Sequence, residues 1–500
     1  MESVVGGESQ RRLNKYACAC AMVGSMISII FGYDTGVMSG AMIFIKEEFE
    51  VKESQLEVLA GILNLCALVG SLCAGRTSDF IGRRYTIALA SLIFMLGSVL
   101  MGYSPNYNVL LAGRCTAGIG VGFALMIAPV YAAEISSPKT RGFLSSLPEI
   151  GISVGILLGY ISNNLFAKLT LKLGWRVMLG IAAFPSLLLA IGILKMPESP
   201  RWLIMKGRIG EAKKIMYKVC DDEEEAQQRL KDIKRAAGID ENCTDDIVQI
   251  SKAGQKVQTG GVWKELLLKP TPTVRRMLLA GVGIHFFEHA TGTEAVILYG
   301  PRIFKKAGVT ARKKLLLATV GVGLTKLVFI TLSTFIIDRV GRRKLLLTSI
   351  AGMIVSLTGL ATCLTVVEHS DEKLIWALVM SLIFVYTFIM FFNVGLCPVC
   401  WVYSAEIFPM KLRAAGASVS VAMNRAMNAT VSMTFLSLSN AITIGGAFYL
   451  YTGMAVLALF FVYFCLPETK GRSLEDMEEI FSKPSKNSKT ELELTNSELN

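Results

Sequence analysis

Apolar segments long enough to cross a lipid bilayer as helices recur in two sets of six. The first set lies near 16–41, 56–76, 85–103, 108–133, 143–165 and 176–196. The second set lies near 275–300, 314–337, 344–367, 374–404, 414–440 and 446–466. A helix of about 20 apolar residues spans the hydrocarbon core of a bilayer. The sequence therefore predicts an all-α membrane protein with twelve transmembrane helices.

Composition excludes a soluble globular chain of this length. Hydrophobic residues make up 52% of the 500 residues and charged residues only 18%, and the mean hydropathy is +0.51. The eleven cysteines fall almost all inside apolar segments without the spacing of metal ligands, so we interpret them as small core residues. The net charge is +12. Much of the basic charge lies in the loops between the apolar segments and in the central polar segment, which is typical of cytoplasmic loops and not of nucleic-acid binding.

Polar segments divide the chain into five predicted parts. These are a cytosolic N-terminal tail (1–15), a six-helix half (16–196), a cytosolic helical linker domain (197–273), a second six-helix half (274–466) and a cytosolic C-terminal tail (467–500). Arg11, Arg12 and Lys15 place the N-terminus in the cytosol by the positive-inside rule, and an even number of spans returns the C-terminus there. The basic loop at 302–314 is an exception, because it would lie outside.

Loop sequences repeat between the two halves. GRTSDFIGRRYT, from Gly75, returns as STFIIDRVGRRKLL, and PVYAAEISSPKTRG, from Pro129, returns as PVCWVYSAEIFPMKLRAAG. PESPRWL, from Pro197, is matched by PETKGRSLE, from Pro467. These repeats predict two homologous halves related by an axis along the membrane normal.

One predicted span, HFFEHATGTEAVILYGPRI from His285, carries Glu288, His289 and Glu294 in its middle. A charged carboxylate at the centre of a membrane helix costs roughly 2.5–3.5 kcal/mol, whereas each large apolar residue gains only about 0.3–0.6 kcal/mol. The polar residues must therefore face other helices and a polar cavity. Gly292 allows the helix to bend or unwind there, and interrupted helices mark transporter binding sites.

Asp34 in the first span and Arg114 near the start of the fourth are a second intramembrane feature. They are either a permanent buried ion pair or a proton switch, in which movement of Arg114 changes the affinity of Asp34 for a proton. The residues alone leave both interpretations open.

Together these motifs resemble the sugar porter family of the major facilitator superfamily over nearly the whole chain. Within that family, HFFEHATGTEAVILYGPRIF, GVGLTK and AMNRAMN are similar to segments of plant-type polyol/monosaccharide transporters. The resemblance implies alternating access about one central cavity. It also implies a proton-coupling role for Asp34 and Arg114, with the proton as coupling ion and no other cofactor and no metal.

The resemblance further implies a substrate site built by both halves. Its residues are Phe31, Glu149, Ser153, Ile156, Glu288, His289, Glu294, Lys326, Asn393, Trp401, Asn424 and Arg425. Neutral residues of the hexose porters are replaced here at Glu149, Glu288, His289, Glu294, Lys326 and Arg425. Ring-sugar contacts therefore do not transfer unchanged. Either the acids neutralise the bases, or the charged groups bind the hydroxyls of an open-chain polyol, and both can hold.

Paired charges of opposite sign also recur in the repeated loops. They are Asp79, Arg83, Arg84, Glu134, Arg141, Asp338, Arg342, Arg343, Glu406 and Arg413. The bases alone would fix the orientation in the membrane, but the pairing with acids favours a cytoplasmic gate of salt bridges.

The sequence thus predicts a proton-coupled symporter of sugar alcohols such as sorbitol, mannitol and xylitol, and of monosaccharides. It would be a monomeric, multi-pass protein of the plasma membrane, with lipid, protons and these small molecules as its partners and no nucleic acid. The alternatives are a facilitative uniporter and a non-transporting sugar sensor. An enzyme is not predicted, because no nucleophile–base pair or metal cluster is visible in the sequence.

Overall fold

The computed structural model describes twelve stretches of the chain. They are residues 14–136, 141–220, 222–236, 239–240, 246–247, 266, 268, 270–309, 311–370, 374–408, 412–470 and 480–482. Most of both predicted tails and a large part of the predicted linker lie outside these residues, so the domain boundaries stay predictions.

The N-terminal half consists of seven helices. They are α1 (Lys15–Phe49), α2 (Glu53–Ile81), α3 (Arg83–Tyr103), α4 (Tyr107–Ile135), α5 (Arg141–Phe166), α6 (Leu171–Gly180) and α7 (Ala183–Ile193). The predicted sixth span at 176–196 corresponds to Leu171–Ile193, which is long and apolar enough to cross a membrane. It starts earlier than predicted and is divided into α6 and α7. Pro185 has no N–H to donate to the carbonyl of Ile181, and this favours the break.

Broken helices are more frequent in the C-terminal half. Its elements are α12 (Pro272–Ala290), α13 (Thr293–Lys306), α14 (Arg312–Val340), α15 (Arg342–Glu368), α16 (Ile375–Phe391), the π-helix η2 (Phe392–Leu396), α17 (Cys397–Glu406), α18 (Arg413–Ile442) and α19 (Ile444–Cys465). Ten helical segments, with α6–α7 and α16–α17 each counted as one, are long and apolar enough to cross a membrane. The remaining two predicted spans are α12–α13 and α18, which carry buried ionisable residues.

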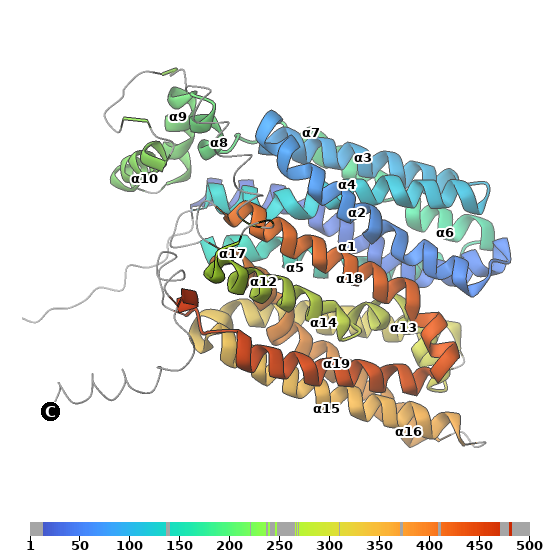
Figure 1. Ribbon diagram of the computed structural model, residues 1–500. Helices are drawn as coiled ribbons and strands as arrows, with labels where there is room; N and C mark the ends of the chain where they lie inside the picture. The colour runs from blue at the N-terminus through green and yellow to red at the C-terminus, as the bar shows by residue number, and fades with distance from the viewer. Residues whose placement is uncertain are drawn as a thin grey trace, which may run out of the picture.

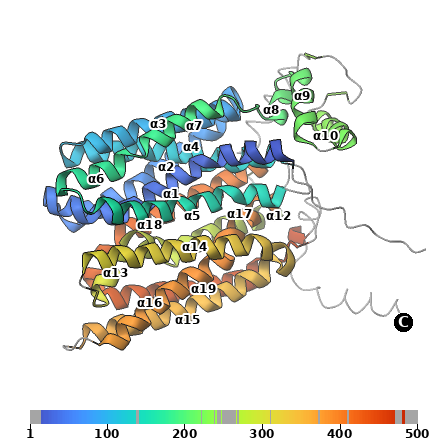
Figure 2. The same ribbon diagram turned by 180° about the vertical axis from the view of Figure 1, so that it is seen from behind.

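The helices run roughly along one common direction and form two layers (Figure 1). The blue-to-teal helices of the first half lie above the yellow-to-red helices of the second, and the view from behind shows the same division (Figure 2). Across the division α2 packs on α18, α5 on α14 and α1 on α13. These contacts enclose the centre of the bundle between the halves.

Close packing inside the first half depends on small residues. Helix α1 packs along α5, and a Cβ atom added at Gly155 would lie 2.0 Å from the carbonyl oxygen of Ile29. Gly32 and Gly36 of α1 face α5 in the same way. Such small-residue contacts allow backbones to approach closely inside a membrane, where no hydrophobic effect drives helix association.

A group of short helices lies beyond one end of the bundle (Figure 1). It consists of α8 (Pro200–Met205), α9 (Ile209–Val219) and α10 (Glu223–Ala236). Trp202 of α8 belongs to a small apolar cluster of this group, and its indole N–H donates to the carbonyl of Asp79 at 3.1 Å. We call this end of the bundle the linker end, and the other one the opposite end.

Candidate functional site

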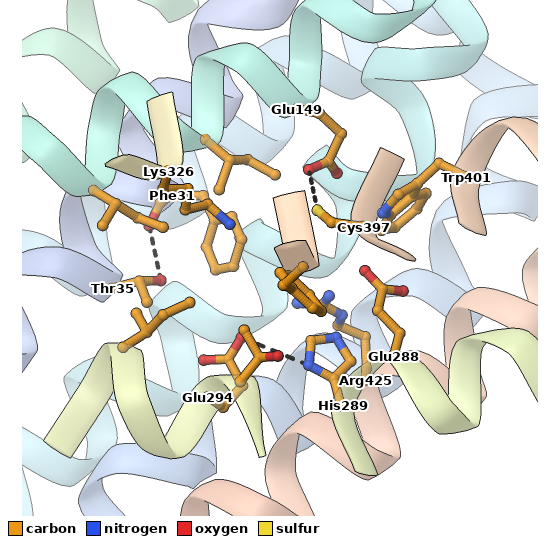
Figure 3. A pocket seen from close by; sticks show the side chains of 15 residues that line it. Phe31, Thr35, Glu149, Glu288, His289, Glu294, Lys326, Cys397, Trp401 and Arg425 are labelled. Atoms are coloured by element: carbon orange, nitrogen blue, oxygen red, sulfur yellow. Dashed lines mark hydrogen bonds and ion pairs between the residues drawn. The ribbon is translucent and has the colours of Figure 1, made fainter. Parts of the chain in front are cut away.

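A cavity lies between the two halves (Figure 3). Helices α1, α5, α12, α13, α14, α17 and α18 and the π-helix η2 contribute to its wall. The lining residues are Phe31, Thr35, Glu149, Ile152, Ile156, Glu288, His289, Thr293, Glu294, Ile297, Lys326, Phe392, Cys397, Trp401 and Arg425. Apolar and aromatic groups therefore alternate with ionisable ones around a single space.

Most of the substrate-site residues predicted from the sequence line this cavity, and three do not. Ser153 is buried and its hydroxyl donates to the carbonyl of Glu149 at 3.1 Å. Asn393 donates through Nδ2 to the carbonyl of Ile389 at 2.7 Å. Asn424 lies behind the wall, where it connects several lining residues. A substrate role for the residues at the cavity stays a prediction.

The break between α12 and α13 brings the polar groups of these helices to the cavity. Gly292 adopts a left-handed backbone conformation with φ of +83°, which a side chain rarely tolerates. A Cβ atom there would also lie 2.4 Å from the ring of Tyr451. The interruption predicted from Gly292 is therefore confirmed. Glu288 and His289 end one helix, and Glu294 begins the next.

Asn424 is the centre of a hydrogen-bond network beside the cavity. Its Nδ2 donates to Glu288 Oε2 at 2.6 Å, and its Oδ1 accepts from Arg425 Nε at 2.9 Å. Oδ1 also lies 3.1 Å from Nε2 of His289. His285 Nδ1 is 3.1 Å from Glu288 Oε2. Asn424 therefore holds both an acid and a base of the cavity in fixed orientations.

Direct ion pairs of the cavity acids with Lys326 or Arg425, one of the two interpretations left open by the sequence, are not found among the described residues. Glu149 Oε2 accepts a hydrogen bond from Cys397 Sγ at 3.7 Å. The Lys326 ammonium lies 5.9 Å from the centre of the Phe392 ring, and the Arg425 guanidinium lies 5.9 Å from that of Phe31. Arg425 donates to Asn424 and Asn64 instead of to an acid. The ammonium of Lys326 can therefore offer donors to a ligand.

Asp34 and Arg114 form an ion pair in the N-terminal half. Arg114 Nη1 lies 2.5 Å from Asp34 Oδ2, and both side chains are 2% exposed. Arg114 Nε also donates to the carbonyl of Leu59 at 3.3 Å. Neither residue lines the cavity, so the pair is a separate ionisable site.

Lining residues missed by the sequence reasoning include Thr35, Ile152 and Ile297. Thr35 lies one helical turn from Phe31, and Ile152 lies nearly one turn from Glu149. Helical spacing from these two predicted site residues could therefore have identified both. Cys397 lies one helical turn before Trp401 on α17, so the same spacing could have identified it. Phe392 could not be found in this way, because it lies in the π-helix η2, which changes the direction of side chains locally.

The π-helix has a clear local cause. Pro398 cannot donate a hydrogen bond to the carbonyl of Val394, and that carbonyl accepts from Ser333 Oγ at 2.6 Å instead. Ser349 Oγ donates to the carbonyl of Phe391 at 2.6 Å. Side chains of neighbouring helices thus satisfy backbone groups that the interrupted helix leaves free.

The predicted gate residues lie at the linker end. Arg83 pairs with Glu134 at 3.1 Å and with Asp79 at 3.2 Å, and Arg342 pairs with Glu406 at 3.0 Å. Arg84 and Arg343 donate to backbone carbonyls of Met196 and Tyr463. The side chains of Arg141, Asp338 and Arg413 lie outside the described residues. Their gate role stays a prediction.

The PES and PET repeats have a structural role that the sequence reasoning did not assign. Glu198 accepts from the backbone N–H of Arg83 at 2.8 Å, and Glu468 accepts from that of Arg342 at 2.9 Å. Each carboxylate thus caps the N-terminus of the third predicted span of one half, α3 or α15. Burial raises the pKa of Glu198. Burial acts likewise on Glu468, but backbone N–H donors outweigh it and lower the pKa of that residue.

One group of side chains could be considered as a metal site. His285, Glu288 and Cys400 place one potential ligand atom each within 4.8 Å of one another. Cys400 Sγ donates to the carbonyl of Ile284 at 3.6 Å, and His285 Nε2 lies 3.2 Å from Ser404 Oγ. Hydrogen bonding accounts for this arrangement, and three ligands alone do not complete a tetrahedral site.

The sequence matches a known family of transporters. The sequence profile of the family described as "Sugar (and other) transporter" matches residues 18–481. The chain belongs to this family. It is therefore an integral membrane transporter and not an enzyme, and the resemblance predicted from the loop motifs is confirmed.

Two named relatives and one solved structure agree with this family assignment. The chain is 62% identical to "Probable polyol transporter 6" of Arabidopsis thaliana, over 97% of this chain and 98% of the relative. It is 63% identical to "Probable polyol transporter 3" of the same plant, over 95% and 93%. The major facilitator superfamily proton:xylose symporter XylE, bound to 6-bromo-6-deoxy-D-glucose, has a TM-score of 0.78 at 27% identity, over 93% of this chain and 99% of that chain; XylE is a protein of E. coli.

Proposed function

We propose that this protein is a proton-coupled symporter of polyols and monosaccharides that works by alternating access. The observation that carries the proposal is one cavity between two helical halves, lined by ionisable side chains from both. The names of the plant relatives support polyols as substrates. The name of the XylE symporter supports proton coupling and acceptance of pentoses.

The cavity chemistry suits an open-chain polyol. Such a molecule carries a hydroxyl group on each carbon, and each hydroxyl both donates and accepts a hydrogen bond. Glu149 and Glu294 offer acceptors, and Lys326 offers donors, on different walls of the cavity. Hydrogen bonds to charged groups are worth about 1.5–3 kcal/mol each. The indole of Trp401 supplies the apolar surface on which the carbon chain or a sugar ring would rest.

Proton coupling is assigned to the ion pair of Asp34 and Arg114. A buried carboxylate that loses its guanidinium partner gains affinity for a proton, because desolvation favours its neutral form. A conformational change that separates Arg114 from Asp34 would therefore cause Asp34 to bind a proton. Re-formation of the ion pair would release this proton. This cycle links proton binding to the movement of the halves.

We place the transporter in the plasma membrane, as a monomer with both termini in the cytosol. The linker end then faces the cytosol and the opposite end faces outward. Basic loops at the linker end support this orientation by the positive-inside rule. A facilitative uniporter is the second candidate, and it would use the same cavity without a proton step.

Uptake of radiolabelled sorbitol at two external pH values tests the proposal. Uptake should exceed equilibrium at acidic external pH, and mannitol, xylitol and glucose should compete. Asp34→Asn should abolish uphill uptake while exchange of internal for external sorbitol persists. Glu368→Gln, which changes an exposed carboxylate at a helix end, is the control. Uphill, pH-dependent uptake by Asp34→Asn would contradict the proton role, and equilibrative uptake by the unaltered protein would favour the uniporter.

A further inference from the structure

His289 and Glu294 face each other across the break between α12 and α13 (Figure 3). Nδ1 of His289 lies 3.7 Å from Glu294 Oε1. Both residues line the cavity, and their relative exposures are 4% and 8%. The cavity wall therefore contains a buried imidazole and a buried carboxyl group at near-contact distance.

The neighbouring amide determines which nitrogen of His289 carries hydrogen. Nδ2 of Asn424 must face Glu288, because a carboxylate can only accept hydrogen bonds. Oδ1 of Asn424 must face Arg425, because a guanidinium can only donate. Nε2 of His289 lies 3.1 Å from that same Oδ1, so it carries the hydrogen. Neutral His289 then has a bare lone pair on Nδ1.

This lone pair points at a second acceptor. Within the part of the chain that the structure describes, Nδ1 of His289 is a buried atom without a hydrogen-bond partner. Its neighbour at 3.7 Å is an oxygen of Glu294, which as a carboxylate also only accepts. One added proton between these two acceptor atoms allows a hydrogen bond or an ion pair to form. It makes either a carboxylic acid that donates to Nδ1 or an imidazolium paired with the carboxylate.

The charge balance of the cavity independently indicates one bound proton. Glu149, Glu288 and Glu294 are three acids, whereas Lys326 and Arg425 are two permanent bases. With neutral histidines the wall carries one uncompensated negative charge, which is costly in a buried, low-dielectric site. The other titratable groups near the cavity acids are His285, Tyr160, Cys397 and Cys400. None of these adds a permanent positive charge.

We propose that the His289–Glu294 pair binds one proton inside the substrate cavity, as a second proton site besides Asp34 and Arg114. The inference rests on the proposed proton-coupled transport and extends it. The bound proton makes the cavity neutral before it closes around a neutral polyol. Loss of this proton leaves a negative charge that closure would have to desolvate, so substrate binding weakens.

Infrared difference spectroscopy on the purified, full-length protein tests the site without any substrate. In Asp34→Asn, which removes the first proton site, a pH change should still reveal one titrating carboxylic-acid or imidazolium signal. Glu294→Gln in this background should remove the signal. His289→Gln, which changes no permanent charge, should shift or remove it, and Glu368→Gln should leave it unchanged. Absence of a titrating signal in Asp34→Asn, or a signal untouched by His289→Gln, would overturn the proposal.

Binding of sorbitol to the same proteins tests the link to substrate. In Asp34→Asn the affinity should fall with rising pH by up to about tenfold per pH unit, as expected for one linked proton. In Asp34→Asn with Glu294→Gln the pH dependence should disappear. Affinity that does not change with pH in Asp34→Asn would overturn the link. Failure of sorbitol to bind at any pH would contradict the polyol assignment, while the infrared signal would still decide the proton site.

Discussion

The two ends of the helix bundle are held together in different ways. At the linker end, the described ion pairs of the predicted gate join helices of one half. Arg83 pairs with Glu134 inside the first half, and Arg342 pairs with Glu406 inside the second. The carboxylate caps Glu198 and Glu468, which directly follow the first and the second half, likewise bind only the half that precedes them.

At the opposite end, acidic residues of α1 and α2 bind groups of the second half. Glu53 pairs with Arg302 at 3.1 Å and accepts from Asn440 Nδ2 at 2.7 Å. The buried Glu57 accepts from the backbone N–H of Ser437 at 2.7 Å and also from its hydroxyl. Arg312 pairs with Glu47 at 2.8 Å, a further contact of the same kind.

This difference between the two ends indicates which contacts should break during alternating access. A pair inside one half moves with that half and survives alternating access. A pair between halves must break when the bundle opens at its end. We therefore expect the contacts of Glu53 and Glu57 to hold the opposite end closed. The pairs of Arg83 and Arg342 should stabilise each half instead of acting as the gate predicted from the sequence.

Cys397 provides a native reporter for this comparison, because it lines the cavity. In a variant that retains only this one of the eleven cysteines, the labelling rate by a membrane-impermeant maleimide measures access. The reagent is added on the side that the proposed topology makes extracellular. Opening at the opposite end should raise the rate.

The largest effect is expected for Glu57→Ala. Glu57 is only 3% exposed, and loss of its hydrogen bonds to Ser437 should favour the open form by about 1.5–3 kcal/mol. The labelling rate of Cys397 should rise about tenfold or more. Glu57→Gln keeps an acceptor oxygen and should show a smaller rise. An unchanged rate in a folded Glu57→Ala protein would mean that this contact does not hold the end closed.

A smaller effect is expected for Arg302→Ala. The side chains of Arg302 and Glu53 are 29% and 38% exposed, and such pairs contribute about 0.2–1 kcal/mol after solvent screening. The labelling rate should therefore rise by no more than about fivefold. Lys305→Ala, at an exposed position of the same helix, is the control. A rise as large as that of Glu57→Ala would show that Arg302 holds the end closed in more ways than through this pair.

No effect on labelling is expected for Arg83→Ala. This change removes pairs with Glu134 and Asp79, which all belong to the first half. The melting temperature should fall by a few degrees, because the N-terminal half loses partly buried ion pairs. Circular dichroism of the detergent-solubilised protein measures this fall. Faster labelling of Cys397 in Arg83→Ala would show that both ends control access, and would remove the contrast between them.

Local patterns were sufficient to predict much of this fold. Apolar length and the repeated loops predict the helices and the two halves, because each membrane helix must satisfy its backbone within itself. Gly292 predicts the break between α12 and α13, since its left-handed conformation depends on the residue itself. The break between α6 and α7 was missed, because the apolar character of the chain is uninterrupted there.

The candidate site was predicted in part. The family resemblance led to Glu149, Glu288, Glu294, Lys326 and Arg425, which do line the cavity. The pairing among these acids and bases was left open, because residue types do not reveal distances between helices. Phe392 was missed, since the π-helix that contains it forms with the help of Ser333 and Ser349 from other helices. Cys397 was missed although it lies one helical turn before Trp401 on α17.

The sequence by itself determined the membrane-spanning architecture, the two halves and the charged composition of the central wall. Only the tertiary structure decided how those charges are used. It placed the amide of Asn424 between an acid and a base, and so left Nδ1 of His289 facing Glu294. It also set Glu57 against Ser437 across the two halves. The physical reason is that helix formation depends on neighbours in the chain, whereas hydrogen bonds and buried charges depend on groups brought together from distant segments.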